Sequence, residues 1–323
     1  DPLWSRGLGD VYKRQGCFVW IEKITLTSNN MVSHLPSAMD QPLVLFFHGN
    51  SFPASTYQVM LNELRRRGMQ VQALEKIGHN PAYPVTSNWP YLVEEIHAFA
   101  QPLIARHAGP VVLVGHSLGG MLSLMMAAQF PHVADAVVMV DAPALGGLQA
   151  KVLQLSKTLS LNKKFSPGTI SRKRKNEWNS IEAVHAHFSS KKVFARWDPQ
   201  TLHDYVTHGT HEEHSVNGTK RVLSFDRNIE TLIYESVPHN LEQLLKRHPL
   251  RCPVSLVAAR HSKEMRLAGM ELSRKITKGR ICMIDGTHLV PMEKPLVTAA
   301  AIEASLLNML SLKAAKSPNP GKP

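Results

Sequence analysis

The amino-acid sequence predicts an α/β protein with a mostly parallel central sheet flanked by helices and an inserted helical cap. Apolar runs of strand length, among them residues 42–47, 111–114 and 136–140, alternate with segments whose apolar side chains recur every three or four positions. Strands that are apolar along their whole length are typical of parallel sheets covered on both faces. The alternation stops after Asp141 and resumes near residue 251, which indicates an insertion between two parts of one core.

The composition fits one large globular domain or a domain with an insertion. The 323 residues are 43% hydrophobic and 19% charged, so a sizeable core can be buried. Three widely spaced cysteines predict neither a disulfide framework nor a zinc site, and a reducing cytoplasm fits best. No apolar run reaches the roughly 18 residues of a membrane span. Oligomeric state is left open by the sequence.

The domain boundaries follow from shifts in pattern. Residues 1–16 lack an initiating methionine and resemble translated adaptor sequence, so we expect a non-native leader there. We expect the core at residues 17–141 and 251–312, the cap at residues 142–250, and a disordered tail at residues 313–323.

Each core element is predicted from its own pattern of apolar residues. The expected strands are residues 17–27, 42–47, 69–74, 111–114, 136–140, 253–258 and 280–284. Expected helices present apolar stripes such as Tyr57, Met60, Leu61 and Leu64, or Leu92, Ile96, Phe99 and Leu103, or Leu118, Met121, Leu122 and Met125; two more cover residues 262–278 and end near Leu312. The cap shows helical patterning and no strong strand.

The turn between the strand at residues 111–114 and the following helix reads Gly-His-Ser-Leu-Gly. A Gly-x-Ser-x-Gly turn holds its serine in a strained conformation at the carboxyl edge of a sheet, while the next N–H points at the same place. Gly115 and Gly119 lie where helix and strand come closest, so side chains there would collide. Ser117 is therefore the reactive group at the apex, where a nucleophile belongs.

Four features together resemble the α/β-hydrolase superfamily. They are the His-Gly-Asn turn at residues 48–50, the Gly-His-Ser-Leu-Gly-Gly elbow, the segment Gly-Thr-His-Leu-Val-Pro-Met-Glu-Lys-Pro at residues 286–295, and the helical insertion. The resemblance covers residues 17–312 and implies a serine nucleophile. Through its Arg-Lys-Arg-Lys run and the Phe-Asp-Arg-x-Ile-Glu stretch at residues 225–230, the cap also resembles that of uncharacterised bacterial hydrolases, which implies no particular substrate.

The resemblance implies roles for the other polar groups of the site. His288 follows the last strand, where this fold carries the base that accepts the proton of the serine. The N–H groups of Asn50 and Leu118 fit an oxyanion hole, and His48 and Gly49 shape the turn that carries Asn50. His116 precedes the nucleophile in many members of the superfamily, and we interpret it as a packing or orienting residue.

Two carboxylates can complete the triad. The loop that usually carries the acid has no aspartate, but it contains Glu264, two residues after Ser262. Ser262 is a good helix N-cap, however, and an acidic residue in a first helical turn is expected merely to suit the helix dipole. Asp141 ends a strand, and a rigid strand end holds a carboxylate more firmly than a helix start does. We favour Asp141 and keep Glu264 as the alternative acid.

Two further motifs receive structural interpretations. His211-Glu212-Glu213-His214 contains zinc-ligand residue types, but it lacks the His-Glu-x-x-His spacing, and we expect a solvated cap loop and no metal site. The net charge of +12 and the basic run at residues 172–175 raise nucleic acid or an anionic membrane as partners. Without interleaved aromatic residues the run predicts a solvated cap face, or else attraction of acidic substrates, and no specific nucleic-acid partner.

The sequence thus predicts a serine hydrolase that cleaves a carboxylic ester through an acyl-enzyme, without cofactor. The expected substrate is a small, apolar acyl compound. Thioester or carbon–carbon bond hydrolysis on the same triad is an alternative, and a non-catalytic binding protein is another, because folds host many functions. The serine nucleophile argues against the dehalogenases and epoxide hydrolases of the superfamily, which use an aspartate. We expect apolar cap residues such as Leu145, Leu148 and Phe188 to be available to line the pocket.

Overall fold

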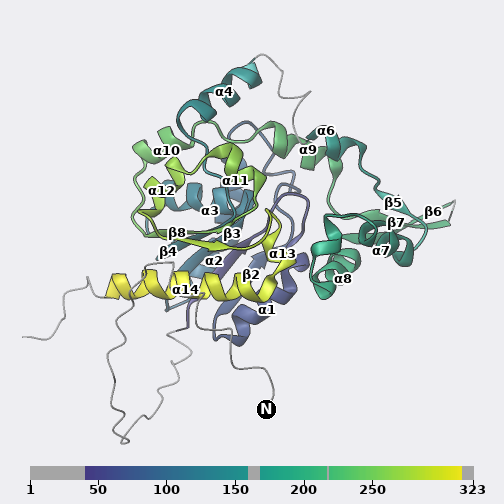
Figure 1. Ribbon diagram of the computed structural model, residues 1–323, viewed down its shortest axis with the longest axis horizontal. Coiled ribbons are helices and arrows are strands. Elements are labelled where there is room, and N and C mark those ends of the chain that lie inside the picture. The colour runs from purple at the N-terminus through teal and green to yellow at the C-terminus, as the bar shows by residue number, and fades with distance from the viewer. Residues whose placement is uncertain (1–40, 159–167, 217, 315–323) are drawn as a thin grey trace, which may run out of the picture. The chain divides into compact units, whose positions relative to one another are not determined.

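The structure is a computed structural model that describes residues 41–158, 168–216 and 218–314. A six-stranded parallel sheet lies at its centre in the order β2-β1-β3-β4-β8-β9 (Figure 1). Its strands are β1 Leu43–Phe47, β2 Gln70–Leu74, β3 Val111–His116, β4 Ala136–Val140, β8 Val254–Ala259 and β9 Ile281–Ile284. The predicted fold class is confirmed. The expected strand at residues 17–27, the leader and the tail from residue 315 onward lie outside the described residues.

The register of the sheet brings several loop starts to one edge. Phe47 of β1 pairs with Gly115 of β3, and Gly115 pairs with Met139 of β4. The strands are parallel, so the segments that follow β1, β3 and β4 all leave the sheet at the same end. The His-Gly-Asn turn, Ser117 and Asp141 therefore become neighbours through the backbone alone.

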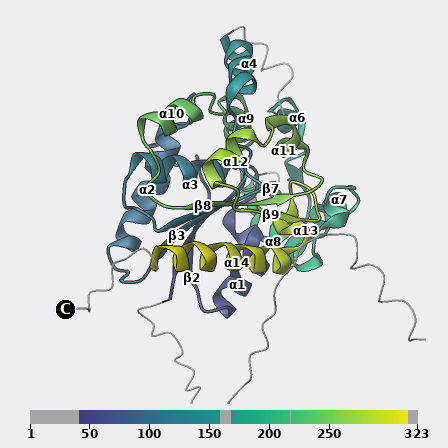
Figure 2. The ribbon, with the colours of Figure 1, turned by 60° about the vertical axis from the view of Figure 1, so that its left-hand side comes forward.

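Helices cover both faces of this sheet, as the uninterrupted apolar strands predict. Alternate β1 side chains, Leu45 and Phe47, pack against α2 (Pro90–Ile104) and α3 (Leu118–Gln129). The intervening Val44 and Phe46 pack on the other face against α1 (Gln58–Arg66) and α14 (Pro295–Ala314). Figure 2 shows α14 along one side of the sheet and α12 (Glu271–Thr277) on the other.

Two helical segments differ from the sequence prediction in their division. The single helix expected at residues 262–278 consists of α11 (Lys263–Ala268) and α12, and Gly269 ends the first of them. The short helix α13 (Val290–Glu293) precedes the last helix, because Pro295 starts a new helix. Neither difference moves the segments that carry the predicted site.

The insertion after β4 contains a small antiparallel sheet besides its helices, and the helical patterning of the sequence did not predict that sheet. Its helices are α4 Gly147–Thr158, α6 Gly168–Lys173, α7 Ile181–Ser189, α8 Pro199–His208, α9 Arg227–Glu235 and α10 Leu241–Arg247. Its antiparallel sheet has the order β5-β7-β6, from β5 Glu177–Trp178, β6 Thr210–Ser215 and β7 Gly218–Leu223. The side chains of β6 are nearly all exposed, so the strand has no apolar alternation. The available signal was Asn217-Gly218, a pair typical of hairpin turns.

The histidine-rich segment forms part of this hairpin instead of a loop. His211 and His214 lie on β6, three residues apart, and side chains at that spacing point to opposite faces of a strand. His211 Nδ1 lies 3.3 Å from Ser224 Oγ, and His214 Nδ1 lies 2.8 Å from Thr219 Oγ1. Across the described ranges, no group of three or more His, Cys, Asp or Glu side chains is arranged to hold a metal ion.

An aromatic cluster joins the insertion to the core. Phe52, which follows the His-Gly-Asn turn, packs edge-on against Trp197 and Tyr205 of the insertion, with ring centroids 5.5 and 5.6 Å apart. Phe188 belongs to the same cluster and is 4% exposed. Such aromatic pairs add stabilisation beyond their buried area.

Candidate active site

Ser117 lies between β3 and α3 with φ of 51° and ψ of −114°, a conformation that residues with a side chain rarely adopt. The Ser117 N–H donates to Val140 C=O at 3.0 Å, and the Gly119 N–H donates to His48 C=O at 3.1 Å. A Cβ at Gly119 would lie 1.9 Å from the Phe47 carbonyl oxygen, and one at Gly115 would lie 2.2 Å from the Gly119 backbone. Any side chain at Gly115 or Gly119 would therefore clash with the backbone, so both positions require glycine.

Three side chains predicted from the sequence meet at the carboxyl edge of the sheet. His288 Nε2 lies 2.9 Å from Ser117 Oγ, and His288 Nδ1 lies 2.7 Å from Asp141 Oδ2. An ionised carboxylate can only accept hydrogen bonds, so Nδ1 carries the proton of the imidazole. Nε2 is then free to accept the hydrogen bond of the Ser117 hydroxyl.

Asp141 is rigidly held where β4 ends. Its carboxylate is fully buried, and its second oxygen, Oδ1, accepts the Ala259 N–H at 2.7 Å. Its own N–H donates to Val257 C=O at 2.7 Å, which ties Asp141 to β8. Backbone groups of a neighbouring strand thus fix the carboxylate in one orientation.

Glu264 lies farther from the histidine and has a second role. Its Oε2 is 4.0 Å from His288 Nδ1, beyond hydrogen-bond distance, and its side chain is 47% exposed. Ser262 caps α11 by accepting the Met265 N–H at 3.2 Å, so Glu264 occupies the first helical turn. The structure brings Asp141, and not Glu264, into hydrogen-bond contact with His288.

Asn50 and Leu118, the residues expected to supply the oxyanion donors, both lie beside Ser117 in the cavity lining. The N–H groups of Asn50 and Leu118 have no acceptor within the described part of the chain, and both residues line the cavity. His48 Nδ1 donates to Gly49 C=O at 2.8 Å, and His48 Nε2 accepts the Ile77 N–H at 2.8 Å. The Gly49 carbonyl and the Asn50 N–H belong to one planar peptide and point in opposite directions, so His48 also orients that N–H.

Two buried histidines near the nucleophile, His48 and His116, are neutral. Burial lowers the pKa of His48 to about 4 and that of His116 to about 3. The ring nitrogens of His116 contact Tyr57 Oη and the His288 carbonyl, and neither is bonded to Ser117. His116 is thus a structural partner of the site, as interpreted from the sequence.

Ser117 opens into a cavity of about 1180 Å³ between the core and the insertion. Its apolar lining includes Trp89, Leu118, Met121, Leu145, Leu153, Ile233, Val237, Leu267 and Ala268. Lys192, Arg196 and Lys263 also contribute. Leu145 lines the cavity as expected, whereas Leu148 is 73% exposed and Phe188 belongs to the aromatic cluster, so neither of these two lines it.

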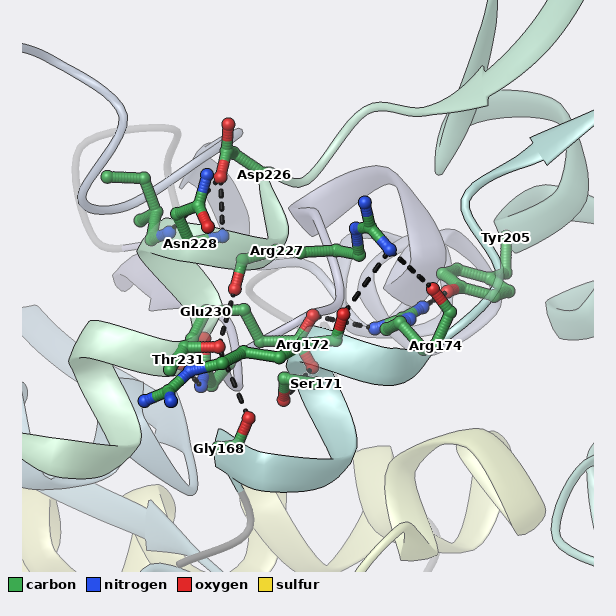
Figure 3. A network of polar contacts seen from close by, with 12 residues as sticks. Gly168, Ser171, Arg172, Arg174, Tyr205, Asp226, Arg227, Asn228, Glu230 and Thr231 are labelled. Carbon is green, nitrogen blue, oxygen red and sulfur yellow. Dashed lines mark hydrogen bonds and ion pairs between the residues drawn. The ribbon is translucent and has the colours of Figure 1, made fainter. Parts of the chain in front are cut away.

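Two arginines of the basic run at residues 172–175 form ion pairs within the insertion, so the run is not simply a solvated face. Arg174 lies 2.8 Å from Glu230 and donates to Tyr205 Oη at 2.7 Å (Figure 3). Arg172 pairs with Glu235. The Glu230 carbonyl accepts a hydrogen bond from Asn50 Nδ2 at 3.0 Å, so α9 is tied directly to the His-Gly-Asn turn.

Sequence reasoning missed this tie between insertion and turn. The signals were present as a Ser-Arg-x-Arg stretch and as Glu230 within Phe-Asp-Arg-x-Ile-Glu, but a basic run gives no indication of which of its members is buried. Tyr57 was recognised only as part of an apolar stripe. The contacts of its hydroxyl were missed because the sequence does not show which polar atoms meet in the folded chain.

Comparison with known proteins places this geometry in context. The sequence profile described as "Alpha/beta hydrolase family" matches residues 44–301. A monoglyceride lipase homolog of Monkeypox virus is 24% identical over 237 residues, 64% of this chain and 85% of the viral protein. The 2-(acetamidomethylene)succinate hydrolase of Mesorhizobium japonicum is 29% identical over 119 residues, 34% of this chain, and the match spans 41% of that enzyme's length.

Among solved structures, the thioesterase domain from the curacin biosynthetic pathway superimposes with a TM-score of 0.62 at 19% identity, covering 82% of this chain and 92% of the domain. At that identity the likeness concerns the fold. Within the described part of the chain, no helix combines the length and apolar character needed to cross a membrane.

Proposed function

Because this chain belongs to the alpha/beta hydrolase family, we propose that it is a serine hydrolase that cleaves carboxylic esters through an acyl-enzyme. The observation that carries the proposal is the contact of His288 with Ser117 on one side and with buried Asp141 on the other. A hydroxyl is a weak nucleophile unless a base accepts its proton, and this arrangement provides that base.

The steps follow from these contacts. His288 Nε2 accepts the Ser117 proton as Oγ attacks the ester carbonyl carbon, and Asp141 stabilises the imidazolium that forms. The N–H groups of Asn50 and Leu118 stabilise the negative charge on the carbonyl oxygen. The imidazolium then gives its proton to the departing alkoxide, which leaves as an alcohol and an acyl-enzyme. Water, deprotonated by His288, releases the acid by the same route.

Thioesters and activated carbon–carbon bonds remain alternative substrates, because the same nucleophile, base and oxyanion donors serve all three reactions. An oxygen ester is favoured because its alkoxide is a poorer leaving group than a thiolate and needs the proton that the His288 imidazolium delivers. A purely binding function would require neither a serine activated in this way nor two unpaired N–H groups beside it.

The cavity supports an apolar acyl group. Most of its inner lining is aliphatic or aromatic, and burying apolar substrate surface there gives about 25 cal/mol per Å². A series of p-nitrophenyl esters of rising acyl length tests this, since kcat/KM is expected to rise with chain length until the cavity is filled. A constant kcat/KM from acetate to octanoate contradicts an apolar acyl site.

Covalent labelling tests the proposed nucleophile. We expect a fluorophosphonate probe to label the wild-type protein stoichiometrically and Ser117→Ala not at all. His288→Ala should lose at least three orders of magnitude in labelling rate, whereas His185→Ala, an exposed histidine remote from the cavity, should label normally. Circular dichroism and melting temperature verify that the variants fold. Unlabelled wild-type protein, or labelled Ser117→Ala, contradicts the proposal.

A further inference from the structure

A chain of buried hydrogen bonds runs behind the candidate active site. The Gly49 N–H donates to Tyr57 Oη at 2.9 Å, and Tyr57 Oη lies 2.8 Å from His116 Nδ1. His116 Nε2 lies 2.8 Å from the His288 carbonyl oxygen. Tyr57 and His116 are each 1% exposed, so the chain lies away from bulk water and its bonds are correspondingly strong.

The direction of every bond in this chain is fixed by its two ends. A carbonyl oxygen only accepts, so His116 Nε2 carries the proton that points to His288. Burial keeps the pKa of His116 near 3, so the ring holds this single proton at neutral pH, and Nδ1 must accept. The Tyr57 hydroxyl therefore donates to Nδ1, which leaves its oxygen lone pairs for the Gly49 N–H.

The two ends of this hydrogen-bond chain, the Gly49 N–H and the His288 carbonyl, belong to the two loops that carry the proposed oxyanion donor and the proposed base. Gly49 precedes Asn50, which lines the cavity and is the proposed oxyanion donor, and the loop after β9 carries His288. Gly49 is held on its other side by His48 Nδ1 at 2.8 Å. A Cβ at Gly49 would lie 2.7 Å from His116 Nδ1 and 3.1 Å from Tyr57 Oη, so the turn fits closely against the two side chains.

We propose that Tyr57 and His116 are positioning residues that hold the oxyanion turn and the His288 loop in one fixed relation. The inference rests on the proposed function. Neither residue is placed to react, because Tyr57 does not line the cavity and both ring nitrogens of His116 are occupied. The two residues act through the Gly49 N–H and the His288 carbonyl, that is, through backbone that carries a donor and a base.

Tyr57→Phe is the sharpest test, because it removes one oxygen atom and preserves the packing of the ring. We expect kcat to fall about tenfold with little change in KM, since the preorganised N–H of Asn50 acts in the transition state. A trifluoromethyl ketone, which binds as a tetrahedral adduct, should lose affinity by the same factor, whereas an unreactive amide of equal acyl length should not. Thr277→Val is the control, because it removes another fully buried hydroxyl, bonded to Ser273 C=O at 2.8 Å and remote from the site.

Variants of His116 separate the two halves of the chain. Gln at this position can keep a donor for the His288 carbonyl, Asn can keep an acceptor for Tyr57, and Leu keeps neither. We expect His116→Leu to lose more activity than either amide variant. Should His116→Leu fail to fold, Tyr57→Phe and the two amides still decide.

The outcomes are distinct. The inference is overturned if Tyr57→Phe keeps the wild-type kcat and the wild-type affinity for the ketone. It is also overturned if Tyr57→Phe loses affinity equally for the ketone and the amide, and if that loss matches the fall in melting temperature in the same way as in Thr277→Val. Wild-type protein that neither hydrolyses esters nor reacts with a fluorophosphonate removes the proposed function and this inference together. An active wild type with an unaffected Tyr57→Phe removes the inference alone.

Discussion

At the scale of single residues, the acid beside His288 is decided by distances that chain order does not contain. Asp141 and Glu264 both follow the serine and precede the histidine, and the sequence therefore leaves both possible. The difference of 2.7 against 4.0 Å arises because β4 lies next to β3 in the sheet, which brings the end of β4 under the histidine.

Replacement of each carboxylate gives the corresponding kinetic prediction. We expect Asp141→Asn to lower kcat by about four orders of magnitude, because an amide N–H facing Nδ1 favours the wrong tautomer of His288. Glu264→Gln should stay within a factor of about three of wild type. Steady-state ester hydrolysis measures both variants, and the reverse ranking would assign the role to Glu264.

The buried histidines make stability depend on pH. His48 and His116 have folded-state pKa values of about 4 and about 3, below the value of about 6.5 expected in the unfolded chain. The unfolded chain therefore binds protons first as pH falls. The stabilising effect of each neutral ring is complete above pH 6.5 and is lost below it, by roughly 1.4 kcal/mol per pH unit until the folded-state pKa is reached.

Urea unfolding at pH 7 and pH 5 measures this effect. We expect the difference in unfolding free energy between the two pH values to shrink in His116→Gln, which has no ring to protonate. His185→Gln, at an exposed position on α7, should keep the wild-type difference. An unchanged pH dependence in His116→Gln contradicts a neutral buried imidazole.

At the scale of elements, α9 is fixed from two directions. Its Glu230 carboxylate is held by Arg174 at 2.8 Å and by Ser171 Oγ at 2.9 Å (Figure 3). The Glu230 carbonyl accepts from Asn50 Nδ2. The insertion is therefore tied to the turn that carries an oxyanion donor. A shift of α9 should change catalysis as well as stability.

Arg174→Met tests this anchor against an exposed pair in the same insertion. We expect it to lower the free energy of unfolding by about 3 kcal/mol, because Glu230 is left charged and buried without its partner. Lys220→Met breaks a pair with Glu177 whose members are 51% and 52% exposed, and it should cost under about 1 kcal/mol. Equal losses in urea unfolding would show that the buried pair contributes no more than the exposed one.

Elements were predictable where burial imposes a pattern. β1, β3, β4 and β8 are buried along their whole length and largely apolar because both faces of the sheet are covered, and each was expected within two residues of its observed ends. β6 and β7 escaped prediction because a solvent-exposed hairpin needs no apolar face. Arg174, whose side chain is 19% exposed, escaped for the opposite reason, since only tertiary contact distinguishes it from its charged neighbours.

At the scale of the whole molecule, the net charge is +12, and some of the basic side chains that contribute to it line the cavity. Lys192, Arg196 and Lys263 line it, and none of them forms an ion pair within the described ranges. Glu264 and Glu293 also line the cavity, so the cations exceed these carboxylates by one, and we expect a modest preference for acyl compounds that also carry a negative charge. The field should be strongest at low ionic strength, because salt screens exposed charges.

Matched esters measure the effect of this charge. We expect Lys192→Gln to lower kcat/KM several-fold for an ester with a distal carboxylate, and to have a smaller effect on its neutral methyl-capped analogue. Lys191→Gln removes the same charge one residue away, outside the cavity lining, and should have little effect on either ester. The same loss for both esters would assign Lys192 a purely structural role.

The backbone conformation of Ser117 has a consequence for how this protein can evolve. Its φ of 51° with ψ of −114° suits glycine better than serine, and relief of such strain is worth about 1–3 kcal/mol. Ser117→Gly should therefore raise the free energy of unfolding in urea, whereas Ser117→Ala, which keeps a Cβ, should not. Selection for thermal robustness alone would then favour loss of the nucleophile, so a serine persists at this position only under selection for turnover.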